Sequence, residues 1–453
     1  MRQTRGATTL LLAALLAGCA APTPIPTTSG SAEASPSAIP TPTAAPPSTT
    51  PVPSIALSRD DGWRADIDTL LEARERLHPD PWHAMTRADW VAAADAVKAR
   101  IPTLTDDQAL VELVRLATLP GIAGREGHTG IFPFIPGSGT HEYPILLWQF
   151  SDGLVITRAR APYEDLVGSR IDAVNGNPIA TVLKLVEPLA PRDNDSTLLA
   201  YGPLYLRVSE LLAGLGVIPA AGPTTFTITD RNGATRDVTI EPISAEDDIA
   251  WHGGAPLDLP AGEPDWLRDP TTPLWWTFLP DSGTLYVQYN VVTGGIDATA
   301  DEILDRVKQG DVERVVVDLR HNGGGNNVTY RHFLSVLQDP LIDRPGRLVL
   351  LTGRLTFSAA ANFATELEQT TGAWFAGEAM GGSPNLYGDV RETHLVNSGQ
   401  SVFVATRYWQ KSTPDDPRVT IEPALPVPYS LEDWLGGRDP VLDAVLQETP
   451  PGV

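Results

Sequence analysis

Ser358 lies where a serine hydroxyl could act as a nucleophile. An apolar run at residues 348–351 predicts a buried strand, and Ala359 to Thr371 predicts a helix of small residues. A hydroxyl between them lies at a helix N-terminus, where free N–H groups and the helix dipole favour developing negative charge. Serine is also a preferred N-cap residue, so a simple helix cap is the alternative.

A glycine-rich segment follows another apolar strand. Residues 318–327 read Asp-Leu-Arg-His-Asn-Gly-Gly-Gly-Asn-Asn, directly after the valines at 315–317. Glycines there allow unusual backbone angles and close approach to a ligand, and ligands bind at the carboxyl ends of strands in open α/β sheets. No Gly-Lys-Ser/Thr follows, and asparagines interrupt a dinucleotide-binding pattern. A tight turn without function is the other interpretation.

Together the two segments resemble the C-terminal-processing (tail-specific) serine peptidases and their tricorn-core relatives. Those proteins carry an Asp-Leu-Arg-x-Asn-x-Gly-Gly loop, then a nucleophilic serine followed by alanine at the head of a helix. Shorter matches extend over most of the chain, at residues 77–79, 127–129, 377–378, 381–385, 397–399, 421–423 and 437–440. The resemblance implies a crotonase/Clp-protease-like α/β core, a polypeptide substrate and Ser358 as nucleophile.

The sequence departs from the family pattern at the residue that would pair with the serine as its base. The best-known members carry a lysine 25 residues after the serine, and that position is Ser383 here. The chain has only four lysines, at 98, 184, 308 and 411, and none has the required spacing. Tricorn-type relatives use a histidine, and His128 matches its position. The resemblance therefore implies His128 as general base and then acid, a role that suits neutral imidazole; a structural histidine is the alternative.

The resemblance also implies the rest of the site. The N–H of Ala359 and one from Gly324 or Gly325 would form the oxyanion hole. Four acidic residues could orient His128: Glu422, which we favour, and Asp415, Asp416 and Glu126. Three further residues of matched motifs would line the site: Asn322, Ser383 and Asn385.

No metal or other cofactor is expected, because no His-Glu-x-x-His or similar spacing occurs. His78, beside a proline, is expected to pack against a helix end. His321 either touches substrate or is solvated.

Cys19 ends a short leader. Arg2 and Arg5 precede an apolar stretch of about ten residues, too short for a bilayer-spanning helix of about 20 residues. Residues 16–19, Leu-Ala-Gly-Cys, resemble the bacterial lipobox, whose cysteine is lipidated after cleavage. We therefore expect an extracytoplasmic lipoprotein anchored through Cys19; ordinary secretion and an uncleaved anchor are the alternatives. One cysteine excludes internal disulfides, Cys-based zinc sites and iron–sulfur clusters.

The chain divides by composition. After the leader (1–19), a Pro/Ser/Thr-rich tether (20–55) cannot bury enough apolar area to fold. A helical domain (56–135) follows, then a PDZ-like β-rich domain (140–245), in which Asn-Gly at 175–176 and 232–233 predicts turns. An acidic connector (246–274) leads to the α/β serine peptidase core (275–453), where strands and helices alternate and predict a substantially parallel sheet.

The charge of the chain and the resemblance of its core to serine peptidases lead to three hypotheses of function. With a net charge of −23 and scattered basic residues, nucleic-acid binding is excluded. The first hypothesis is a lipid-anchored serine endopeptidase. The second is a catalytically inactive relative that binds peptides or another ligand at the cell surface, and the third is an esterase of small substrates. The sequence does not determine the oligomeric state.

Overall fold

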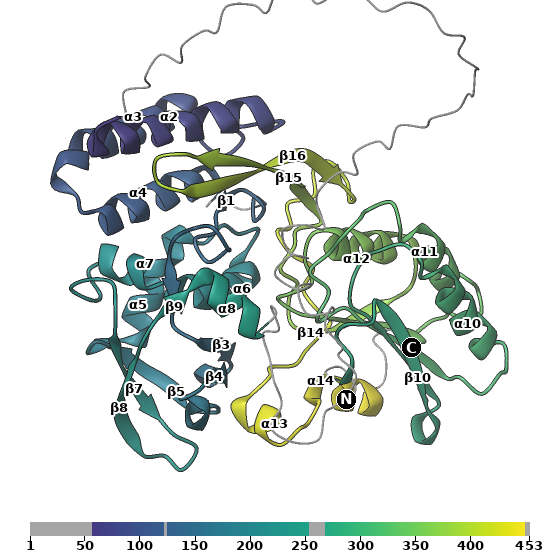
Figure 1. The fold of residues 1–453 in the computed structure, drawn as a ribbon. Helices are drawn as coiled ribbons and strands as arrows, with labels where there is room; N and C mark the ends of the chain where they lie inside the picture. The colour runs from purple at the N-terminus through teal and green to yellow at the C-terminus, as the bar shows by residue number, and fades with distance from the viewer. Residues whose placement is uncertain (1–56, 122–124, 253–267, 449–453) are drawn as a thin grey trace, which may run out of the picture.

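The computed structural model describes residues 57–121, 125–252 and 268–448 (Figure 1). The predicted leader with Cys19, the predicted tether and the middle of the predicted connector lie outside the described residues. Within the described part of the chain, no helix combines the length and apolar character needed to cross a bilayer.

The C-terminal part folds around a six-stranded sheet with the order β10-β11-β12-β13-β14-β17. These strands are β10 (Leu274–Leu279), β11 (Thr284–Tyr289), β12 (Arg314–Asp318), β13 (Leu348–Thr352), β14 (Trp374–Gly377) and β17 (Leu425–Pro426). Only β10 and β11 pair antiparallel, and the other four pairs are parallel. The continuous apolar runs of β12 and β13 are buried, as strands covered on both faces must be. The predicted α/β class is confirmed.

Two hydrophobic cores flank this sheet. One face packs against the helices α10 (Asp297–Val307), α11 (Arg331–Leu337) and α12 (Ala359–Thr370). The other face packs against α13 (Leu431–Leu435), α14 (Pro440–Gln447) and residues from β3 and β4, including Trp148. The β-rich part of the chain therefore contacts the core sheet directly.

The β-rich part is an antiparallel sheet with the order β3-β4-β5-β7-β8. Its strands are β3 (Ile145–Phe150), β4 (Gly153–Ala159), β5 (Arg170–Val174), β7 (Thr224–Thr229) and β8 (Thr235–Ile240). Both predicted Asn-Gly turns form: one leads from β5 into β6 (Asn177–Pro178), and the other joins β7 to β8. Three helices stand between β6 and β7: α5 (Ile179–Val186), α6 (Asp195–Leu206) and α7 (Ser209–Gly214). The helix α8 (Ala245–His252) follows β9 (Ile243–Ser244), which pairs with β2 (His141–Glu142).

Three N-terminal helices complete the fold: α2 (Arg59–Leu77), α3 (Arg87–Arg100) and α4 (Asp106–Thr118). The predicted caps are confirmed, because Thr86 accepts the N–H of Asp89 and Thr105 forms a capping box with Gln108. These helices share one hydrophobic core with the β-rich part.

A long hairpin of the C-terminal part packs against the N-terminal helix α2. Its strands β15 (Asn385–Leu395) and β16 (Gln400–Gln410) extend from the core towards α2 (Figure 1). At its tip the buried carboxylate of Asp66 accepts the N–H groups of Asn397 and Ser398. On its side, β1 (Gly130–Ile131) pairs with β16. The hairpin therefore holds the segment that carries His128, which lies two residues before β1.

Candidate active site

Ser358 has a strained backbone. Its φ of 52° and ψ of −124° lie outside the conformations that L-residues usually adopt, at a cost of about 1–3 kcal/mol. The preceding turn fixes this geometry: Thr356 donates its N–H to the carbonyl of Gly353 (2.8 Å), and Phe357 donates to that of Asn322 (3.2 Å). The side chain of Ser358 does not cap α12, so the simple helix-cap interpretation is wrong.

The glycine-rich loop passes directly over Ser358. Gly324 has a φ of 113°, and a Cβ atom there would lie 2.7 Å from Ser358 Cβ and 2.9 Å from the Ala359 nitrogen. Gly325 has a φ of 138°, and its Cβ atom would lie 2.0 Å from the carbonyl oxygen of Val292. Both positions therefore require glycine, for their backbone angles and for space.

Hydrogen bonds of this loop decide which N–H groups could stabilise an oxyanion. Ala359 is the first residue of α12, where N–H groups lack a partner within the helix. The N–H of Gly324 donates to Asn322 Oδ1 at 3.0 Å, while Asn322 Nδ2 donates to the carbonyl of Tyr289 at 2.9 Å. Asn322 therefore shapes the loop, and Gly325 is the better candidate for the second donor.

His128 is buried beside the turn at residues 353–358 that carries Ser358. Its ring stacks on Phe357 with the ring centroids 4.4 Å apart, and its side chain comes from the segment just before β1. Burial lowers the pKa of His128 to about 3, opposed by a contact with the backbone of Tyr387. The imidazole is thus neutral at pH 7, as a general base must be. Within the described residues neither ring nitrogen has a well-formed hydrogen bond, so a bond to Ser358 is not formed in this conformation.

None of the four carboxylates considered from the sequence bonds to the His128 ring, whose nitrogens find no such partner among the described residues. Glu422 and Asp415 are exposed. Asp416 is buried and faces Arg418 and Ser412, and its hydrogen bonds to Arg418 hold its pKa well below the usual range. Glu126 is buried in a different cluster.

That cluster contains Arg74, His78, His83 and Glu126. Both oxygens of Glu126 accept from Arg74 (2.8 and 3.0 Å), and the Nε2 atoms of His78 and His83 lie 3.1 and 2.9 Å from them. The histidines and Glu126 are close enough together to be considered as metal ligands. The guanidinium already occupies both carboxylate oxygens, however, so the arrangement fits a buried ion pair better than a cation. As predicted, His78 packs at a helix end, the C-cap of α2.

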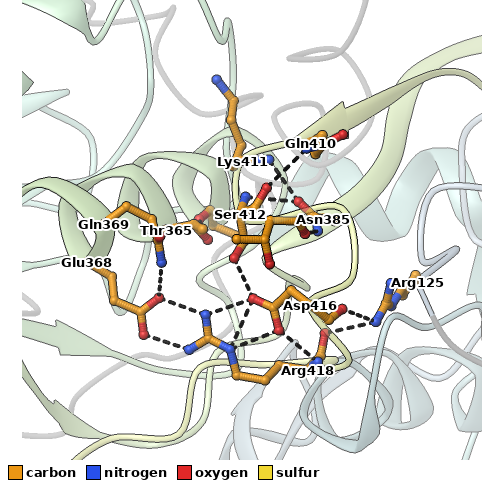
Figure 2. Close-up of polar contacts among 12 residues, drawn as sticks. Arg125, Thr365, Glu368, Gln369, Asn385, Gln410, Lys411, Ser412, Asp416 and Arg418 are labelled. Carbon is orange, nitrogen blue, oxygen red and sulfur yellow. Dashed lines mark hydrogen bonds and ion pairs between the residues drawn. The ribbon is translucent and has the colours of Figure 1, made fainter.

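Figure 2 shows the polar network that holds residues 411–418 against α12. Arg418 binds Asp416 and also Glu368 of α12, with nitrogen–oxygen distances of 2.7 and 2.9 Å to the latter. Arg125 donates from Nη2 to the backbone carbonyls of Asp416 (2.7 Å) and Arg418 (3.4 Å). Because Arg125 lies three residues before His128, this network connects the histidine segment to α12.

Ser383 and Asn385 support neighbouring backbone. Ser383, at the spacing where relatives carry lysine, is buried and donates from Oγ to the carbonyl of Val419 (2.8 Å). Asn385 donates to the carbonyl of Thr413 (2.9 Å) and accepts the N–H of Lys411 (2.8 Å). The amine of Lys411 binds Glu366.

The Asp-Leu-Arg motif has a structural role. Arg320 is buried between Asp318 at the end of β12 and Asp439, which caps α14; its nitrogens lie 2.6 Å from an oxygen of each. Burial acts to lower the pKa of Arg320, but these two carboxylates together outweigh it and raise that pKa further above its usual value. The motif therefore fixes the strand end from which the glycine-rich loop starts. His321, next along the loop, is buried, so the solvated alternative for it is wrong.

A small pocket lies near this edge of the sheet. It is lined largely by apolar atoms and lies between the carboxyl ends of β12 to β14 and Trp148 of β3. Ser358 and His128 do not line it, and each is only 3% exposed.

Sequence reasoning missed Asp193. Its buried carboxylate accepts the N–H of Gly127, next to His128, and the N–H of Ser383. No local sequence pattern places its carboxylate 2.6 Å from an amide 66 residues earlier in the chain.

Comparison with known proteins supports the fold. No family model matches the chain, and no curated protein matches it by sequence. Among solved structures, a CPAF mutant aligns with a TM-score of 0.61 at 12% identity, covering 86% of this chain and 97% of that chain. Mature CPAF complexed with lactacystin aligns with a TM-score of 0.58 at 14% identity, covering 84% and 96%. The chain therefore has the fold of CPAF, an S41-type serine peptidase, and the fold implied by the sequence resemblance is confirmed.

Proposed function

We propose that this protein is a serine peptidase that cleaves polypeptides through an acyl-enzyme on Ser358. The observation that carries the proposal is the strained Ser358 at the head of α12, with Gly324 directly above it and His128 stacked on the adjacent Phe357. A serine with positive φ, between the N-terminus of α12 and a glycine-rich loop, is arranged to attack a carbonyl and hold the resulting oxyanion.

The reaction uses groups of this chain. Ser358 Oγ attacks the carbonyl carbon of the peptide bond, and its proton passes to His128. The N–H groups of Ala359 and Gly325 donate to the oxyanion. When the tetrahedral intermediate collapses, the C–N bond breaks and the leaving amine takes the proton from His128. Water, deprotonated by His128, then hydrolyses the ester and regenerates Ser358.

A rearrangement must precede this chemistry. Ser358 and His128 are almost completely buried, and among the described residues neither ring nitrogen of His128 has a well-formed hydrogen bond. A rotation of the imidazole from Phe357 towards Ser358 would supply the missing hydrogen bond, because catalytic hydrogen bonds often tighten only when substrate binds. The burial of Ser358 and His128 also favours the second candidate, a catalytically inactive relative that binds peptides or another ligand.

Localisation at the cell surface is part of the proposal. Cys19 would carry a lipid anchor, and residues 20–55 would hold the folded body away from the membrane. Incorporation of radioactive palmitate by cells expressing the wild-type chain, lost in Cys19→Ser, is the expected result. Equal incorporation by both chains would contradict lipidation at Cys19.

The test of catalysis is labelling of the purified protein with a fluorophosphonate, which reacts with activated serines. We expect wild-type labelling to disappear in Ser358→Ala and to fall strongly in His128→Ala. The controls are Ser335→Ala on α11 and His141→Ala, both exposed positions that should label like the wild type. Labelling that persists in Ser358→Ala would remove the nucleophile. A folded wild type that neither labels nor cleaves an unfolded polypeptide would favour the inactive relative.

A further inference from the structure

Asp193 lies between the two segments that flank the candidate active site. Its Oδ1 atom accepts the N–H of Gly127 at 2.6 Å, and its Oδ2 atom accepts the N–H of Ser383 at 2.9 Å. The residue is completely buried. One carboxylate therefore joins the segment of His128 to the loop that follows β14.

Both of these segments contact the nucleophile turn, residues 353–358, which ends at Ser358. A Cβ atom at Gly127 would lie 2.9 Å from the ring of Phe357, the residue before the nucleophile. A Cβ atom at Gly382 would lie 3.4 Å from the Ser358 nitrogen and 2.4 Å from Ala361 Cβ. A shift in either segment would thus change the distance between His128 and Ser358.

The neighbours of Asp193 strengthen the connection. Its own carbonyl accepts the N–H of Arg125 at 3.1 Å. Asn194 donates from Nδ2 to the carbonyls of Met380 and Gly381, both at 3.1 Å, and of Val419 at 2.7 Å. The start of α6 is therefore fastened to the histidine segment and to the loops beside α12.

A helix cap does not account for the carboxylate of Asp193. Asn194 is the N-cap of α6 and already accepts the N–H of Thr197 at 3.0 Å. Two N–H donors point at Asp193 from different segments, and only an ionised carboxylate offers two acceptor oxygens without a donor. Burial raises its pKa to about 6, with the two N–H bonds and Arg125 opposing the shift and Glu126 adding to it. A buried charge is thus kept at neutral pH where a neutral side chain would be cheaper to bury.

We propose that Asp193 is a positioning residue for the reaction of Ser358, holding His128 at the nucleophile turn through its bonds to Gly127 and Ser383. This inference rests on the proposed function. Asp193 acts through His128 and does not touch the substrate. The base would then depend on a residue from the helical insertion between β6 and β7.

The test compares Asp193→Asn with a matched control, Asp195→Asn, which removes the same charge from an exposed position two residues later. In Asp193→Asn one N–H must face an amide NH2 group, so one of the two bonds is lost. We expect the rate constant for fluorophosphonate labelling of Ser358 to fall about 100-fold, as for a displacement of about 1 Å in an active site. For a cleaved peptide, kcat should fall while KM changes little. The control should match the wild type.

A spectroscopic readout separates positioning from general destabilisation. In protein labelled with 15N-histidine, the His128 imidazole resonances, assigned by comparison with His128→Gln, should shift in Asp193→Asn and not in Asp195→Asn. Should Asp193→Asn fail to fold, amide hydrogen exchange of the wild type decides. Slow exchange at Gly127 and Ser383 supports the two bonds, and exchange at the rate of an unstructured peptide overturns the proposal.

The outcomes distinguish this proposal from the proposed function. If the wild type labels and a folded Asp193→Asn labels at the same rate, Asp193 has no positioning role and the serine peptidase stands. If the wild type itself does not label, the proposed function and the role of Asp193 fail together.

Discussion

Replacing Gly324 by alanine should separate the site chemistry from the stability of the loop. The added methyl group would lie 2.7 Å from Ser358 Cβ and 2.9 Å from the Ala359 nitrogen, closer than real Cβ atoms approach. The contacts are with a short side chain and with backbone, neither of which can move aside freely. The loop must therefore move away from Ser358.

Two costs follow, and they have different sizes. A φ of 113° costs a non-glycine residue about 1–3 kcal/mol of folding free energy. Displacing the loop also moves Gly325, the proposed second oxyanion donor. Losing one such donor typically lowers the rate about 100–1,000-fold.

Gly310→Ala provides the matched control. Gly310 has a φ of 92°, and a Cβ atom there would meet nothing within 4 Å. It therefore carries the backbone cost without crowding a site. Urea unfolding should show both variants less stable than the wild type, by about 1–3 kcal/mol each from the backbone alone. Only Gly324→Ala should lose fluorophosphonate labelling of Ser358.

A folded Gly324→Ala that labels at the wild-type rate would refute this reasoning, because the loop would then have no part in the reaction. Equal loss of labelling in Gly310→Ala would also refute it, since the effect would come from general destabilisation.

Three further predictions concern stability. The folded-state pKa of His128 lies near 3, below its ordinary value of 6.5. Its contribution to the free energy of unfolding is therefore complete above pH 6.5 and is lost as the pH falls towards 3. Between pH 6.5 and 5 the wild type should lose about 2 kcal/mol more unfolding free energy than His128→Gln. Urea unfolding at both pH values measures this difference. Parallel pH dependences of the two proteins would contradict the prediction. Arg320→Met leaves two buried carboxylates without their cation and should lower the free energy of unfolding in urea by about 3–5 kcal/mol. The control Arg438→Met, at an exposed position, should lower it by less than about 1 kcal/mol. Similar losses in the two variants would contradict the prediction. Asp66→Ala removes the acceptor of two backbone N–H groups at the hairpin tip and should lower the free energy of unfolding by about 1–3 kcal/mol in the same assay. Asp68→Ala, at an exposed position of the same helix, is the control. Equal stabilities of the two variants would show that the tip does not need Asp66.

Much of the α/β core could be predicted because its signals are local. The valine run of β12, the leucine run of β13 and the small residues of α12 carry their secondary structure in their composition. Glycines at 324 and 325 marked an unusual backbone, and the structure shows why each is needed.

Other parts depended on distant contacts. The sequence presented Ser358 as a possible helix cap, and only the turn from Gly353 to Phe357, held by Asn322, gives it a positive φ. Glu422 was favoured to orient His128, but the structure leaves its side chain exposed. No local pattern could have found Asp193.

The sequence by itself determined the class of the fold, the glycine-rich loop, the serine turn and the absence of a lysine at the spacing used by relatives. Backbone propensity and hydrophobic pattern act over a few residues, so they can be read along the chain. Only the tertiary structure decided that His128 stacks on Phe357, next to Ser358, and that Asp193 fastens its segment in place. Those contacts join residues that are 229 and 66 positions apart, and burial and hydrogen bonding between such distant groups follow from how the layers pack.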